Sequence, residues 1–140
     1  MKKLAVIFII SLLLTACNVN SVETMVLLDE KITKVEVSKS NGVGDINLEI
    51  VKTFEDQPTI RILENAIKNA VMKDVPLPKS TPDYDLIINY GDNLPAHAIH
   101  LWLGNDNEQS VMMYMVEGGD TYVTSMKITK AFRDLLLNEE

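Results

Sequence analysis

Residues 83–103 read DYDLIINYGDNLPAHAIHLWL, two apolar stretches separated by turn-forming residues. The stretches Asp83–Tyr90 and Ala96–Leu103 are rich in aliphatic and aromatic residues, which predicts two strands. Gly91, Asp92 and Asn93 are typical of the turn between them. Strands that follow one another through short turns favour an antiparallel sheet, so this stretch decides the fold class.

The pattern continues toward the C-terminus with another pair of strands and a helix. Val111–Val116 and Thr121–Met126 flank Glu117–Asp120, which predicts a hairpin. The chain then carries apolar residues at helical spacing, with Thr124 or Ser125 as the expected N-cap. These apolar positions are Ile128, Ala131, Phe132, Leu135 and Leu136.

The first half of the chain predicts a hairpin followed by a helix. Ile32–Val37 reads as a strand, and residues 38–45 form a turn cluster. In residues 46–51, Ile46, Leu48 and Ile50 then alternate with Asn47, Glu49 and Val51, which predicts the second strand. Asp56 and Pro58 are typical of a helix start, and the apolar spacing predicts a helix that continues to about Lys73. A loop with three prolines, residues 75–82, follows it.

These elements predict an α+β fold in the order ββαββββα. We expect an antiparallel sheet of about five to six strands with two helices packed on one face. A chain of 140 residues is short enough for a single domain, here residues 24–140. The second sheet face is expected to be open, so a binding surface is expected there or on the loops.

Residues 1–16 predict a signal peptide that is cleaved from the mature chain. Lys2 and Lys3 precede an apolar run, Leu4–Leu14, that is too short to span a bilayer as a helix. The small residues that follow are typical of a cleavage site. This segment is therefore set aside from the fold.

The end of this segment, Leu14-Thr15-Ala16-Cys17, resembles a bacterial lipobox. The resemblance implies that Cys17 receives a diacylglyceryl group and becomes the first mature residue. Two acyl chains suffice for stable anchoring, so the expected partner is a lipid bilayer, on the outer face of the cytoplasmic membrane. Residues 17–23 would be the lipidated Cys and a short tether, because Asn18–Glu23 reaches only about 20 Å when extended.

Composition excludes several other classes of function. Cys17 is the only cysteine, which leaves no intramolecular disulfide and no cysteine-rich zinc site. The net charge of −7 argues against nucleic acid as a partner. No phosphate-binding, dinucleotide-binding or serine-hydrolase motif is present, so no cofactor and no catalytic residue is assigned.

Several motifs together resemble one family. The lipobox, the DYDLII stretch at 83–88, the HLWL stretch at 100–103 and the TYVT stretch at 121–124 before a terminal helix resemble the small uncharacterised lipoproteins of Gram-positive spore-formers, the YhfM-like group. The resemblance covers most of the mature chain. It implies a surface lipoprotein of unknown activity and assigns no catalytic residue.

One strand carries the candidate ligand surface. His100 and Trp102 fall on the same face of strand 96–103, whereas Ile99, Leu101 and Leu103 fall on the core face. An aromatic ring beside a histidine is a possible platform for sugars or apolar rings. The alternative is that Trp102 simply packs against a neighbouring element, and this alternative is favoured.

Metal sites are not predicted. His97 and His100 lie three positions apart, so on a strand they point to opposite faces and do not share a metal. Among Met112, Met113 and Met115 only the last two share a face, and core filling is the more common role of methionine. The acidic stretch 105–108 lacks the glycine and glutamate positions of an EF-hand loop.

Three functions remain open at this point. The first is a non-catalytic accessory or binding domain for an unknown envelope protein or small ligand. The second is an envelope-acting hydrolase that uses His100 and a carboxylate such as Asp85 as acid and base. The third is an inhibitor or immunity-type lipoprotein that presents a rigid loop, for which residues 104–109 and 117–120 are the candidates.

Overall fold

The computed structural model describes residues 21–116 and 118–138. The elements in chain order are β1 (Lys34–Lys39), β2 (Ile50–Phe54), α2 (Gln57–Lys68), β3 (Val71–Met72), β4 (Tyr84–Asn89), β5 (His97–Trp102), β6 (Val111–Tyr114), β7 (Tyr122–Val123) and α3 (Met126–Leu137). The predicted signal peptide, the lipobox and Cys17 lie outside the described residues. No helix within those residues is long and apolar enough to cross a bilayer.

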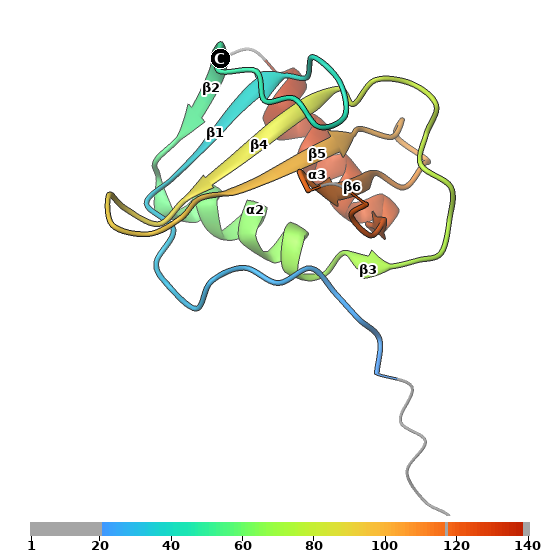
Figure 1. The fold of residues 1–140 in the computed structure, drawn as a ribbon, viewed down its shortest axis with the longest axis horizontal. Coiled ribbons are helices and arrows are strands. Elements are labelled where there is room, and N and C mark those ends of the chain that lie inside the picture. Colours follow the sequence, from blue (N-terminus) through green and yellow to red (C-terminus); the bar gives the residue numbers. More distant parts are fainter. Residues whose placement is uncertain (1–20, 117, 139–140) are drawn as a thin grey trace, which may run out of the picture.

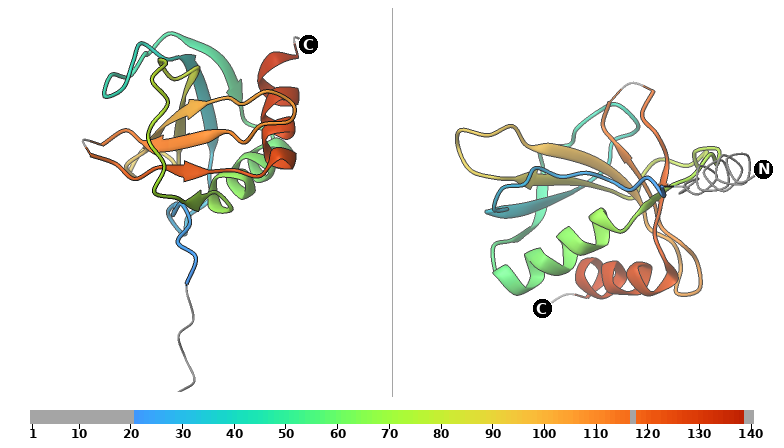
Figure 2. Two further views of the ribbon diagram at one scale, coloured as in Figure 1. Left: turned by 90° about the vertical axis from the view of Figure 1, so that its right-hand side faces the viewer. Right: turned by 90° about the horizontal axis from the view of Figure 1, so that it is seen from below.

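The strands form one antiparallel sheet in the order β2-β1-β4-β5-β6-β7-β3. The strand β2 is at one edge and β3 at the other, so α2 carries the chain across the sheet between its two edges. Both helices lie on the same side of the sheet (Figure 2). The α+β prediction, with its antiparallel sheet and two helices on one face, is therefore confirmed.

The helices begin where the sequence predicts. Asp56 is the N-cap of α2 and accepts a hydrogen bond from the Thr59 backbone N–H at 2.9 Å. Ser125, rather than Thr124, is the N-cap of α3 and accepts from the Ile128 N–H at 3.3 Å. Apolar residues spaced three or four apart turn one stripe of each helix toward the sheet, where they are buried. These residues include Ile60, Leu63 and Ile67 from α2, and Phe132 and Leu136 from α3.

The core lies between the helices and one sheet face. Alternate strand residues supply that face, as the period of two requires. Its most buried members from the sheet are Val35, Val37, Leu86, Ile88, Ile99, Leu101 and Met112. The prediction that Ile99 and Leu101 point into the core is confirmed.

The first hairpin differs from its prediction. The strand β2 begins at Ile50, and residues 40–49 form a long connection instead of the predicted strand that begins at Ile46. We call residues 40–49 the cover loop. Its segment lies over the ends of β1 and β4, on the sheet face that is turned away from the helices (Figure 1).

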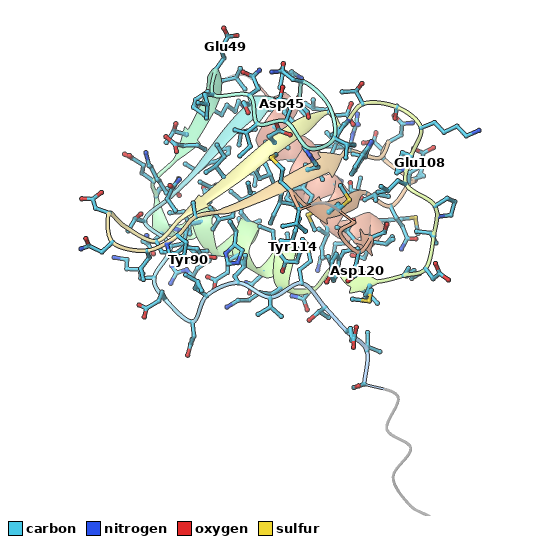
Figure 3. All side chains as sticks on the ribbon, in the orientation of Figure 1. Asp45, Glu49, Tyr90, Glu108, Tyr114 and Asp120 are labelled. Carbon is cyan, nitrogen blue, oxygen red and sulfur yellow. The ribbon has the colours of Figure 1, made fainter. Side chains whose placement is uncertain are left out.

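The N-terminal segment 21–28 is part of the fold. Thr24 forms a bridge with Val71, and Met25 and Leu27 are buried in the core. The hydroxyl of Tyr114 contacts both backbone groups of Val26 at 2.6 Å, accepting from its N–H and donating to its carbonyl oxygen. Tyr90 and Tyr114 lie along this segment (Figure 3).

Candidate functional site

The second sheet face carries a row of side chains from adjacent strands. In the strand register Ser38 of β1 lies opposite Asp85 of β4, Asp85 lies opposite His100 of β5, and His100 lies opposite Met113 of β6. Opposite residues in an antiparallel pair share a face, so the four side chains are neighbours. Sequence reasoning placed His100 on this face and offered Asp85 as its carboxylate partner, and the register brings the two together.

Asp85 and His100 form a hydrogen-bonded pair that is closed to water. The His100 Nδ1 and Asp85 Oδ1 atoms are 2.8 Å apart, and both side chains are 0% exposed. The pair is part of a second buried cluster on the outer face, which includes Ser38, Trp102 and Met113. The expectation that this face would be open is wrong over its central strands.

The cover loop supplies the remaining contacts of the pair. The Gly44 backbone N–H donates to His100 Nε2 at 3.0 Å, and the Asn47 backbone N–H donates to Asp85 Oδ2 at 3.3 Å. Because Nε2 accepts a hydrogen bond, the ring proton is on Nδ1 and is donated to Asp85. Both ring nitrogens and both carboxylate oxygens are therefore engaged.

Gly44 meets His100 in a conformation that favours glycine. Its φ is 84°, in the left-handed region that side chains with a Cβ rarely adopt. The Asn41-Gly42 pair and Gly44 mark this segment as a turn in the sequence, but nothing in the sequence indicates that its backbone reaches His100.

Ser38 and Trp102 differ in how their polar atoms are satisfied. The Ser38 Oγ is buried and has no hydrogen-bond partner among the described residues. The Trp102 indole N–H donates to the Ser80 carbonyl oxygen at 2.8 Å, beneath the proline-containing loop. Trp102 is 5% exposed, so His100 and Trp102 do not present an open platform, and their role as a ligand surface stays a prediction.

A pocket of about 460 Å³ opens beside the cover loop. Its lining joins the loop to β6 and to the segment after β6. The side chains that line it are aliphatic or thioether groups, and none of the lining residues is ionisable. They are Val43, Gly44, Leu77, Met113, Met115, Val116, Gly118 and Gly119.

His97 lies apart from this site, as the strand period requires. Its Nδ1 is 2.8 Å from the Tyr90 hydroxyl, and its ring packs against those of Tyr90 and Tyr114. Burial lowers the pKa of His97 below its ordinary value of 6.5. Within the ranges 21–116 and 118–138, no cluster of three or more His, Cys, Asp or Glu side chains is arranged to hold a metal.

The comparison with protein families decides what the chain is related to. Residues 28–140 match the family model described as YhfM protein. The chain belongs to the YhfM family. Both members of the Asp85–His100 pair and the whole cover loop fall within the part of the chain that matches the YhfM model.

A solved structure has a similar fold. It is described as the crystal structure of a thioesterase-like protein from Clostridium sporogenes ATCC 15579, with a TM-score of 0.59 and 12% sequence identity. The alignment covers 77% of this YhfM-family chain and 96% of the other chain. At that identity the likeness shows the fold alone. None of the curated proteins compared with the chain matches it.

Loops 104–109 and 117–120, the candidates for an inhibitory contact, differ in how they are held to the rest of the domain. Loop 104–109 is tied to α3, because Arg133 Nε donates to Asp106 Oδ1 at 2.8 Å and Arg133 Nη1 donates to the Gly104 carbonyl oxygen at 3.1 Å. Of loop 117–120, only residues 118–120 lie within the described part of this YhfM-family chain. Gly118 and Gly119 line the pocket beside the cover loop.

Proposed function

We propose that this member of the YhfM family is a lipid-anchored binding domain on the outer face of the cytoplasmic membrane. The lipobox resemblance at Leu14–Cys17 supports the anchor. Acylated Cys17 would hold the domain to the bilayer, and the folded part would bind an envelope protein or a small ligand. No activity is needed for that role.

One observation favours binding over catalysis. A general base needs a nitrogen that can take a proton from a substrate. His100 Nε2 already accepts a hydrogen bond from Gly44, and the His100 ring is fully buried. With the cover loop in place, the Asp85–His100 pair holds the loop and offers no free nitrogen to a substrate.

The experiment for this proposal is a pair of measurements on intact cells. Wild-type and Cys17→Ser chains are expressed, membranes are separated from soluble material, and crosslinked partners are identified by mass spectrometry. We expect wild type in the membrane fraction with a recurrent envelope partner, and Cys17→Ser released with that partner lost. Membrane association of Cys17→Ser equal to that of wild type would refute the anchor.

The second candidate function is an envelope-acting hydrolase. It is favoured by the 2.8 Å contact between Asp85 and His100, since a carboxylate that orients an imidazole is the arrangement of many base-assisted hydrolases. The similar structure is also described as a thioesterase-like protein. In that case water would be the nucleophile and His100 Nε2 the base, after the cover loop has moved.

A direct assay separates the two candidates. The purified full chain is incubated with an acyl thioester and with a p-nitrophenyl ester, beside a His100→Gln variant. The binding proposal predicts equal background rates for wild type and variant. Turnover by wild type that disappears in His100→Gln would replace the binding proposal with the hydrolase.

A further inference from the structure

The cover loop is attached to the sheet mainly by polar contacts. Its backbone donates to His100 Nε2 and Asp85 Oδ2, and the Asn47 side-chain amide donates to the Lys39 carbonyl oxygen at 2.8 Å. Hydrogen bonds of this kind are exchangeable, because another molecule with the same donors satisfies the same acceptors.

Apolar burial contributes little to this attachment. The large aliphatic side chains of the loop, Val43, Ile46 and Leu48, are 57%, 37% and 76% exposed. Asp45 and Glu49 are exposed, and Glu49 extends outward from the loop (Figure 3). Of the three aliphatic side chains, only Ile46 has less than half of its surface exposed, so the loop loses less hydrophobic stabilisation when it moves away than a core segment would.

The surface under the loop holds a polar group without a partner. The Ser38 hydroxyl is fully buried beside Asp85 in the β1–β4 register, and it makes no hydrogen bond within the described part of the chain. An unsatisfied buried hydroxyl is destabilising, so its presence points to a partner in another state of the site.

We propose that the cover loop is a displaceable lid and that the surface beneath it binds a peptide segment with a turned backbone like that of the loop. Two backbone N–H groups of the peptide would replace those of Gly44 and Asn47 on His100 Nε2 and Asp85 Oδ2. The Ser38 hydroxyl would donate to a peptide carbonyl oxygen, and an aliphatic side chain would enter the pocket beside Met113 and Met115. This inference rests on the proposed binding function and names its site and ligand class.

A peptide fits the site because the loop is itself a peptide in the same place. The two acceptors are contacted by main-chain amides three residues apart. The uncharged pocket next to them suits an apolar side chain. The lid therefore occupies its own ligand site while it is closed.

The first test opens the lid with Gly44→Pro. Proline has no N–H and fixes φ near −65°, whereas Gly44 has φ of 84°. The matched control is Gly42→Ala, which strains a residue with φ of 142° in the same loop but keeps both donors to the pair. Full chains are purified in detergent and treated with diethyl pyrocarbonate, which acylates unprotonated imidazole nitrogens.

The readout is the acylation of His100 relative to His97 in the same molecule, measured by mass spectrometry. We expect a rise of about tenfold in Gly44→Pro, the effect of losing about one hydrogen bond, and no change in Gly42→Ala. A ratio equal to that of wild type in a folded Gly44→Pro protein would overturn the lid. Should this variant fold poorly, Asn47→Pro removes the other donor and is judged by the same ratio.

The second test supplies the ligand. A peptide that copies residues 41–50 is titrated into Gly44→Pro, and the fluorescence of Trp102, the one tryptophan of the chain, is followed. We expect saturable binding that protects His100 from acylation, and no binding by a peptide N-methylated at the position of Gly44. If the unmodified peptide shows no saturable binding to Gly44→Pro and does not protect its reactive His100, the proposed ligand class is overturned. Neither outcome affects the Cys17 anchor, which fractionation tests separately.

Discussion

Asp85 and His100 are both removed from water, so each depends on the other and on two loop amides for its hydrogen bonds. Breaking such a pair by removing one partner leaves the other buried and unsatisfied. We expect Asp85→Ala to lower the free energy of unfolding by about 2–4 kcal/mol. Chemical denaturation followed by circular dichroism measures this loss.

The control for that prediction lies two residues away. Asp83 is exposed and accepts a hydrogen bond from the Leu103 backbone N–H. We expect Asp83→Ala to change stability by no more than about 1 kcal/mol. Equal losses of unfolding free energy in Asp85→Ala and Asp83→Ala would mean that the burial of the Asp85–His100 pair does not determine its contribution to stability.

His97 makes stability depend on pH. Burial lowers its folded-state pKa below the ordinary value of 6.5, so below that value the unfolded chain binds more protons than the folded one. Its contribution is complete above pH 6.5 and is lost as pH falls through 6.5 toward the folded-state pKa. We expect wild type to lose more stability between about pH 7.5 and 5.5 than His97→Gln does. Equal losses of unfolding free energy over this pH range in the two proteins would contradict the assignment to His97.

At the scale of elements, the N-cap residue of α3 explains why the helix begins at Met126, and substituting it tests that explanation. Ser125 Oγ accepts from the Ile128 N–H. We expect Ser125→Ala to lower the free energy of unfolding by about 1 kcal/mol and Ser125→Asp, which keeps the acceptor, to restore most of it. A Ser125→Asp variant as unstable as Ser125→Ala would show that the cap is not the cause.

The N-terminal segment is held by a tyrosine hydroxyl. Tyr114→Phe removes both contacts to Val26, and we expect it to lower the free energy of unfolding by about 1–2 kcal/mol. Amide exchange at Val26 should also accelerate. Tyr122→Phe is the matched control, because its ring packs against Tyr114 and no hydrogen bond of its hydroxyl is found among the described residues. Faster exchange at Val26 in both variants would point to ring packing instead.

Most elements could be predicted because their signals are local. The cap residues, the helical spacing of α2 and α3, and the apolar strands β4 and β5 all follow from residues that are close in the sequence. The two-residue strand β3 was missed, because so short a strand has no period and exists only through its pairing with β7. The helix α2 also ends at Lys68, before the predicted Lys73, because the chain then enters β3.

The cover loop shows where local patterns fail. Residues 46–50 alternate as a strand does, yet the Asn47 N–H donates to the side chain of Asp85 instead of to the backbone of a neighbouring strand. The partnership of His100 with Asp85 was a sequence hypothesis, and the β4–β5 register supplies it. The roles of Gly44, Asn47 and Ser38 depend on contacts across the fold, which the pattern of any single segment does not contain.

At the scale of the whole molecule, the segment before the matched family region belongs to the domain. The YhfM family match begins at residue 28, but Met25 and Leu27 are 1% and 6% exposed. We expect a chain that starts at Asp29 to be less stable than one that starts at Ser21 by about 3 kcal/mol or more, given the apolar area lost. Thermal and chemical unfolding of the two chains would check this, and equal stabilities would contradict it.

Under the proposed function, the side of the domain that carries the N-terminal segment and the side that carries the cover loop have different surroundings. The N-terminal segment 21–28, blue in Figure 1, lies on the side opposite the cover loop. With an anchor at Cys17, the lid and the site beneath it would face away from the bilayer. The ligand would then approach from the aqueous space outside the membrane and not from the bilayer.

The contact between Val26 and Tyr114 also has a consequence for the order of folding. The two residues are separated by 88 positions, so Val26 emerges during synthesis or export well before the residue that binds it. The other backbone partners of this segment, Ala70 and Val71, also come later in the sequence. Contacts between distant residues are slow to form. Until these contacts form, Met25 and Leu27 are exposed, and during that interval their apolar side chains are available to chaperones.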